Sequence, residues 1–177
     1  LPEVSQFDFY DGGGLDVTYL GLAECDPHGN VNVSKFGTNV AGCGGFINIS
    51  QNTQNCIFCG TFTAGGLKTK VEDGKLVIVQ EGKKKKFVSS VEQVTFSGDY
   101  ARRHKMNVMF ITERAVIELL EDGLTVTEIA PGIDLQTQVL DQMDFKPLVS
   151  ENLKTMDLRI FVDAPMGIKD EILAKVK

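Results

Sequence analysis

The sequence predicts an α/β fold with additional β-hairpins, and three observations support this class. Strand-length apolar segments separated by turn residues fill roughly the first 100 residues. Beyond them, strand-length and helix-length segments alternate along the chain. The 177 residues contain no internal repeat and no low-complexity linker, and this length suits one hydrophobic core. We therefore expect a single domain over residues 1–177.

The strands of the first part are separated by recognisable turns. Residues 17–23 read as a mostly apolar strand, and Pro27 followed by Gly29 and Asn30 predicts a turn after it. Extended structure resumes at residues 31–34. Further strands are predicted at residues 56–63, in a hairpin over 68–79 with its turn at 72–74, and at 87–88 and 94–96.

The second part alternates between the two periodicities. Residues 106–111 are a continuous apolar run of strand length, whereas residues 113–120 show helical spacing. Thr112 is a suitable N-cap for that helix, and Gly123 is a suitable C-terminal stop. The remaining predicted elements are a strand over 124–129, a helix over 133–143, a strand over 158–161 and a helix over 169–177.

Glycines are concentrated beside strand patterns between residues 37 and 66. The sequence GCGGFINI at 42–49 is followed by CIFCGTFT at 56–63 and AGG at 64–66. Glycine beside a strand loses packing and costs conformational entropy. Repeated glycines therefore indicate either tight turns between core strands or a backbone that approaches a ligand closely.

Four longer sequence words occur in order along the chain. They are QFDFYDGGGLD at 6–16, GNVNVS at 29–34, GCGGF at 42–46 and TEIAPGIDL at 127–135. Together they resemble the second half of a family I coenzyme A transferase of the acetate/propionate/3-ketoacid kind. The resemblance runs from about Gln6 to Pro147, and several long words in register are far more specific than a lone glycine motif. It implies a C-terminal domain with an open, mostly parallel sheet flanked by helices, of the type shared with glucosamine-phosphate isomerase-like proteins.

The resemblance also implies roles for the glycine-rich segments. In this family the last glycine of the Gly-x-Gly-Gly word supplies an oxyanion-hole N–H, and this role falls to Gly45 here. The expected contacts with coenzyme A come from Gly42, Gly44, Gly45, Phe46, Phe62, Thr63, Ala64 and Gly65. Three amides are candidate donors to substrate or, alternatively, turn-forming and capping groups: Asn30, Asn32 and Asn48.

The nucleophile of the family is a glutamate in a Glu-x-Gly word, which forms a glutamyl-CoA thioester by way of an acyl-glutamyl anhydride. In the family that word precedes the segment corresponding to residues 6–16. We interpret the similar word at 72–74 as a hairpin turn and the one at 121–123 as the end of a helix. Because the sequence begins at Leu1 without an initiating methionine, we expect a piece of a longer protein that is inactive when isolated.

Charge and hydropathy exclude several functional classes. The formal net charge of −6 argues against a nucleic-acid footprint, and no apolar run approaches the ~20 residues that span a bilayer. Locally, Lys83 to Lys86 form a basic run between Gly82 and Phe87. This run is either a solvated hairpin tip or a contact to the phosphates of an anionic cofactor.

Four cysteines raise the question of metal binding. Cys56 and Cys59 lie three apart in a predicted strand, so their side chains point to opposite faces and one metal ion cannot reach both. His28 and His104 are remote in sequence, and we expect no metal site. Buried or half-buried thiols without a signal peptide are typical of a reducing cytoplasm.

Two functional hypotheses of different class follow. In the first, the chain belongs to an enzyme that exchanges coenzyme A between short-chain acyl-CoA and carboxylic acids, with coenzyme A as substrate and no permanently bound cofactor. In the second, it is a non-catalytic CoA-binding or subunit-interaction module. The resemblance implies as partners the missing N-terminal half or subunit, in a homo-oligomer of the full-length protein.

Overall fold

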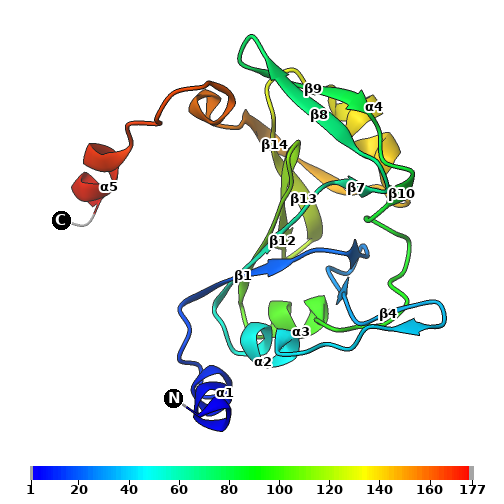
Figure 1. The fold of residues 1–177 in the computed structure, drawn as a ribbon, viewed down its shortest axis with the longest axis vertical. Coiled ribbons are helices and arrows are strands. Elements are labelled where there is room, and N and C mark those ends of the chain that lie inside the picture. The colour runs from blue at the N-terminus through cyan, green and yellow to red at the C-terminus, as the bar shows by residue number, and fades with distance from the viewer. Residues whose placement is uncertain (1, 176–177) are drawn as a thin grey trace.

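The largest element of the computed structural model, which describes residues 2–175, is a six-stranded sheet. Its strand order is β1-β6-β11-β12-β13-β14 (Figure 1). The strands are β1 (Val17–Gly21), β6 (Asn55–Cys59), β11 (Asn107–Ile111), β12 (Ala115–Leu120), β13 (Gly123–Ile129) and β14 (Leu148–Thr155). β1 with β6, β6 with β11 and β13 with β14 pair in parallel, whereas β12 is antiparallel to both neighbours. The predicted class, an open and mostly parallel sheet with helices and hairpins, is confirmed.

Four two-stranded sheets surround this main sheet. They pair β2 (Glu24–Cys25) with β3 (Val31–Asn32), β4 (Lys35–Phe36) with β5 (Asn39–Val40), β7 (Thr63–Ala64) with β10 (Lys84–Lys85), and β8 (Lys68–Glu72) with β9 (Lys75–Gln80). The predicted hairpin over 68–79 is confirmed as β8 and β9. Asp73 and Gly74 at its tip have φ of 51° and 72°, the positive values that a tight hairpin turn requires.

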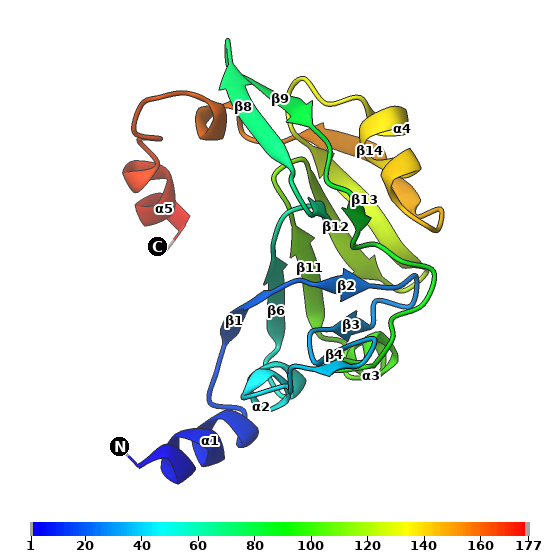
Figure 2. The ribbon, with the colours of Figure 1, turned by 45° about the vertical axis from the view of Figure 1, so that its right-hand side comes forward.

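Short helices connect the strands or close the chain. They are α1 (Glu3–Asp11), α2 (Phe46–Gln51), α3 (Gly98–Arg103), α4 (Leu135–Gln138) and α5 (Lys169–Lys175), with the 3₁₀ turns η1 (Leu140–Gln142) and η2 (Leu158–Phe161). In Figure 2, α2 and α3 lie at one end of the main sheet, and α5 lies away from it. The predicted C-terminal helix is confirmed as α5, while residues 176–177 lie outside the described residues.

The prediction of a helix over 113–120 was wrong, because Ala115–Leu120 form the central strand β12. Its successive residues Val116 and Ile117 point to opposite faces of the sheet and are both buried, and such a strand loses the alternation that marks strands in a sequence. Thr112 does accept bonds from the N–H groups of Arg114 and Ala115, but it caps a turn between strands. Gly123 likewise opens β13 and ends no helix.

Three other predicted elements differ in the structure. The helix over 133–143 is broken into α4 and η1 at Val139, whose side chain is fully buried and whose φ and ψ are −121° and −67°. Residues 158–161 form the turn η2 and no strand. The strands at 87–88 and 94–96 shrink to isolated bridges of Phe87 with Cys25 and of Phe96 with Val31.

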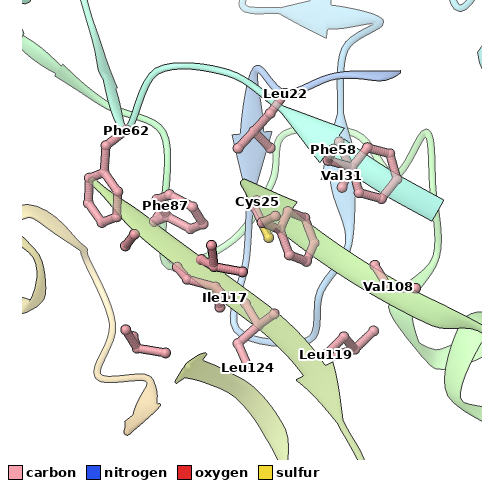
Figure 3. Packing of buried hydrophobic residues seen from close by; sticks show 14 of the residues in the cluster. Leu22, Cys25, Val31, Phe58, Phe62, Phe87, Val108, Ile117, Leu119 and Leu124 are labelled. Carbon is pink, nitrogen blue, oxygen red and sulfur yellow. The ribbon is translucent and has the colours of Figure 1, made fainter. Parts of the chain in front are cut away.

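That core lies on one face of the main sheet and is rich in aromatic rings. Phe58 of β6 is fully buried, and its ring centroid lies 5.0 Å from that of Phe96 and 5.3 Å from that of Phe110. Figure 3 shows Phe58, Cys25 and Ile117 packed in the same volume, with Phe62 and Phe87 beside each other at its edge. Contacts between rings on the strands and rings on the loops therefore fix the loops against the sheet.

The opposite face of the main sheet is only partly covered. Tyr19, Ile57 and Met109 occupy one register row across β1, β6 and β11, and the Tyr19 side chain is 67% exposed. A hollow of about 320 Å³ on this face is lined by Ile57, Met109 and Leu120, among others. Parallel sheets are normally covered on both faces, so this face is an incomplete layer of the fold.

The two cysteines of β6 provide a test of the strand geometry. Cys56 is fully buried, and burial raises the pKa of its thiol to about 12, whereas Cys59 is exposed. The prediction that they face opposite sides of a strand is confirmed, although Cys59 is more exposed than expected. Treatment of the native protein with a thiol reagent should therefore label Cys59 rapidly and leave Cys56 and Cys25 unlabelled until unfolding.

Peptide mapping by mass spectrometry after timed labelling would measure these rates. Cys59→Ser should remove the fastest phase and leave the others unchanged. Labelling of native Cys56 as fast as Cys59, or a disulfide between the two, would contradict the strand assignment.

Candidate functional site

The glycine-rich segment at 42–46 forms a loop that leads into α2. Gly42 and Gly44 are exposed and have φ of 79° and 51°. A Cβ atom at either position would meet no atom within 4 Å, so it is their backbone conformation that favours glycine. Gly45 is the N-cap of α2, with an ordinary φ of −84°. Within residues 2–175, its N–H donates no hydrogen bond.

Two packing contacts hold this loop in place. The Phe46 side chain is buried, and its ring stacks on Phe58 with centroids 5.8 Å apart. On the other side, a Cβ atom at Gly45 would lie 3.1 Å from the Phe7 ring of α1. Asn48 donates from Nδ2 to both carboxylate oxygens of Asp11, at 3.1 and 3.0 Å, which fastens α1 to α2. The loop is therefore fixed between α1 and the aromatic core.

The second predicted segment, residues 62–65, passes from the interior to the surface. Phe62 and Thr63 are fully buried, Ala64 is half-buried and Gly65 is exposed. The Phe62 N–H donates to Glu113 Oε2 at 2.8 Å, and Thr63 Oγ1 donates to Glu81. The side chains of Phe62 and Thr63 thus support the loop from inside, and Ala64 and Gly65 carry its accessible surface.

A fully buried arginine organises this second segment. Arg114 Nη1 and Nη2 lie 2.6 and 3.0 Å from the two carboxylate oxygens of Glu81, and Nε lies 2.6 Å from Glu113 Oε1. Nη1 also donates to the Gln138 carbonyl at 3.0 Å, and the guanidinium lies over the Phe62 ring, 5.1 Å from its centroid. One cation therefore joins four segments of the chain.

The charges of this network stabilise one another. Burial raises the pKa of the Glu81 carboxyl, but hydrogen bonds from Arg114, Thr63 and the Gly82 N–H outweigh it and leave the pKa below its ordinary value. Burial likewise lowers the pKa of the Arg114 guanidinium, but the hydrogen bonds and negative charges of Glu81 and Glu113 outweigh this effect. The pKa of Arg114 therefore lies above its ordinary value. Both groups are accordingly held in their charged forms.

Gly82 allows β10 to approach this network. A Cβ atom there would lie 2.6 Å from the Ala64 carbonyl oxygen and 2.6 Å from Thr63 Oγ1, closer than side-chain carbon atoms approach other atoms. The Gly82 N–H instead donates to Thr63 Oγ1 at 3.1 Å. The glycine therefore lets the basic run beginning at Lys83 lie directly against the loop at 62–65.

The two predicted segments are connected through the core rather than brought together. Successive ring contacts, with centroids 4.7 to 6.5 Å apart, run from Phe46 through Phe58, Phe110 and Phe87 to Phe62. Among the described residues no hydrogen bond joins the loop at 42–46 to the loop at 62–65.

The candidate amides have structural partners. Asn30 Nδ2 donates to Asp26 and its Oδ1 accepts from the Gly98 N–H, both at 3.0 Å. Asn32 donates to Glu24 and to the Lys35 carbonyl, each at 2.7 Å. Both side chains shape turns, which was the alternative interpretation.

Sequence reasoning missed Arg114, Glu81 and Glu113. A signal was present, since Glu113-Arg114 interrupts two apolar runs that both become central strands. Its partner Glu81 lies 33 positions earlier, and no local pattern connects the two. Among residues 2–175, no group of three or more His, Cys, Asp or Glu side chains is arranged to hold a metal ion. No helix in the same range is long and apolar enough to cross a bilayer.

Comparison with known proteins accounts for both the four sequence words and the fold. The chain is 58% identical over 167 residues, 94% of its length, to acetate CoA-transferase YdiF of Escherichia coli K12. The chain is thus homologous to a segment of a family I coenzyme A transferase. It spans about one third of the length of the curated relatives it matches, 32% in the case of YdiF. No protein-family model matches the sequence.

Two further comparisons extend this homology. Caffeate CoA-transferase of Acetobacterium woodii is 51% identical over 176 residues, which cover 97% of this chain and 33% of that protein. The crystal structure of the YdiF acyl-CoA transferase of E. coli O157:H7, a thioester complex with CoA, superposes with a TM-score of 0.92. That match covers 94% of this chain and 33% of the other, at 58% identity. The predicted CoA-transferase fold is thereby confirmed.

The Arg114 network predicts a specific pH dependence of stability. Because the folded-state pKa of Glu81 is lowered, its contribution is complete above the unfolded-state value and is lost as the pH falls through the folded-state value. Wild type should therefore exceed Glu81→Gln in free energy of unfolding at pH 7, and the difference should shrink on acidification. Arg114→Leu should cost about 3 kcal/mol at pH 7, because it leaves two carboxylates without their cation.

Urea denaturation between pH 7 and the acid limit of folding measures both effects. Glu72→Gln is the matched control, since Glu72 pairs with Lys70 on the surface at 2.8 Å and should change stability by at most ~1 kcal/mol. If Glu81→Gln behaved like Glu72→Gln at every pH, the buried network would not stabilise the fold.

Proposed function

We propose that this chain is part of an enzyme that transfers coenzyme A between short-chain acyl-CoA and carboxylic acids through a glutamyl-CoA thioester. The observation that carries the proposal is the 58% identity and TM-score of 0.92 with an acyl-CoA transferase solved as a CoA thioester complex. In this proposal the chain supplies backbone to the oxyanion site and to the CoA channel, and the nucleophilic glutamate lies elsewhere in the parent protein.

The local geometry supports an oxyanion role for Gly45. Attack on a thioester or anhydride carbonyl places negative charge on oxygen, and a fixed backbone N–H stabilises that charge without reorganisation. The Gly45 N–H has no acceptor among the described residues, and Phe46 and Phe7 hold its peptide from two sides. Gly42 and Gly44 add no side chains of their own to the loop that precedes this N–H.

The loop at 62–65 supports the CoA-channel role for only two of its four residues. Phe62 and Thr63 are buried and positioned by Glu113 and Glu81, so they support the loop. Ala64 and Gly65 are the residues that offer surface to a pantetheine or nucleotide portion. The aromatic core fixes this surface relative to Gly45, as transfer through a tethered thioester requires.

The partly covered sheet face supports a partner within the parent protein. Tyr19 and Leu120 are exposed there, although parallel strands are normally covered on both faces. Since the relatives are about three times as long, we propose that the remaining part of the parent protein completes this layer. In the alternative function, a non-catalytic CoA-binding or subunit-interaction module, the same face would still be the contact with the partner.

The isolated chain should have no CoA-transferase activity. Glu72 and Glu121, which lie in Glu-x-Gly words, are both exposed at tight connections, between β8 and β9 and between β12 and β13. We interpret both words as connections between strands and place the nucleophile outside this chain. Incubation with acetyl-CoA and a second carboxylate, followed by mass spectrometry, should give no new thioester.

The full-length protein is the positive control, and its activity should depend on a Glu-x-Gly glutamate upstream of residue 6. Turnover by the isolated chain that Glu121→Gln abolishes would instead place the nucleophile in the β12–β13 connection. A full-length protein that binds CoA without transferring it would favour the non-catalytic module.

Gly45→Ala in the full-length protein should lower turnover by about 10²-fold or less. The substitution keeps the N–H, and the φ of −84° accepts alanine, so folding should change little. The loss arises because the new methyl group lies 3.1 Å from the Phe7 ring and displaces the loop. Steady-state kinetics and thermal unfolding measure the two effects separately.

Gly74→Ala in the turn of the β8–β9 hairpin is the control; its φ of 72° makes alanine destabilising there, but the turn is remote in sequence from the loop at 42–46. Its turnover should be close to wild type. Equal and near-normal rates for both variants would show that Gly45 is only a packing glycine.

A further inference from the structure

The basic run Lys83 to Lys86 lies against the loop at 62–65. β10 pairs with β7 in antiparallel register, with Lys84 opposite Ala64 and Lys85 opposite Thr63. The Lys83 N–H donates to the Gly65 carbonyl at 3.3 Å. The run is thus a strand of the loop structure itself and does not form an independent hairpin tip.

The four lysines divide into two pairs. Lys85 Nζ lies 3.0 Å from Asp144 and 3.1 Å from the Met143 carbonyl. Lys86 is half-buried and donates to the Thr61 carbonyl at 3.0 Å, and its burial lowers its pKa although the nearby Glu113 opposes that shift. Lys83 and Lys84, in contrast, are exposed, and no carboxylate among the described residues lies within 4 Å of either ammonium.

The two unpaired lysines flank a turn without side chains. Gly65 and Gly66 have φ of 78° and 104°. A Cβ atom at Gly65 would lie 3.7 Å from Lys83 Cβ and 3.8 Å from Lys84 Cγ, so these side chains start directly beside the turn. Gln80 Nε2 donates to the Gly66 carbonyl at 2.6 Å, which fixes the turn from its other side. The side chains of two exposed lysines therefore begin next to an accessible backbone turn, in a chain of net charge −6.

We propose that Lys83 and Lys84, with the Gly65–Gly66 turn, bind the phosphate groups of the coenzyme A nucleotide. Phosphate oxygens accept hydrogen bonds from ammonium groups and from backbone N–H groups that no side chain screens. The site rests on the proposed CoA-transferase function and adds residues to it. It gives the channel a cationic end, at the surface edge of the loop whose inner end is fixed by Arg114.

The test uses the full-length protein and the double variant Lys83→Gln/Lys84→Gln. We expect its KM for acetyl-CoA to rise about 10-fold or more with little change in kcat, because two charge-assisted contacts outside the reacting centre are lost. The KM of wild type should also increase with salt more steeply than that of the variant. Lys83→Arg/Lys84→Arg should retain most of the affinity, since the charge is kept.

The control is Lys70→Gln/Lys75→Gln, which makes the same change of net charge in the β8–β9 hairpin and should leave the KM unchanged. Acetyl-dephospho-CoA, which lacks the 3′-phosphate, identifies the phosphate that is bound. Equal KM values for wild type and the variant with this substrate assign the lysines to the 3′-phosphate, and a retained difference assigns them to the diphosphate.

An active double variant with the same KM and salt dependence as the control would overturn the phosphate site and leave the transferase function intact. A wild-type protein that shows no transfer, but loses binding of CoA on the double substitution, would retain the site and overturn the function. The two proposals therefore fail separately.

Discussion

The loop that carries half of the candidate site depends on the burial of one charge, the Arg114 guanidinium. An unpaired buried cation would cost several kcal/mol, so the fold must bring Glu81 and Glu113 to it. Glu81 then orients Thr63 and Gly82, and Glu113 accepts from the Phe62 N–H. The positions of β7 and β10, and with them the basic run, follow from satisfying this arginine.

The aromatic core connects that network to the glycine-rich loop. Phe62 contacts both the guanidinium and the Phe87 ring, and ring contacts continue through Phe110 and Phe58 to Phe46 beside Gly45. A close-packed core of rings has low compressibility, which keeps the two separate loops in a fixed relation. In the proposed function, this rigidity would allow contacts at the nucleotide of an acyl-CoA to position the reacting thioester.

Sequence patterns predicted the elements whose conformation depends mainly on their own residues. The β8–β9 hairpin was predicted because Asp73 and Gly74 favour its turn by themselves. β12 was assigned to a helix because its apolar residues satisfy helical spacing equally well, and only pairing with β11 and β13 decides between the two. α3 was missed although Ser97 caps it, since six residues give too weak a periodic signal.

The sequence by itself determined the resemblance to coenzyme A transferases, the α/β class and the separation of Cys56 from Cys59, because long words and the two-residue period of a strand are local properties. The glycine loop was also identified from its sequence word. Only the tertiary structure decided that Phe62 and Thr63 are buried supports, and that Lys83 and Lys84 remain unpaired beside Gly65. These facts depend on contacts between segments such as Glu81 and Arg114, whose charges meet only when the strands between them have paired.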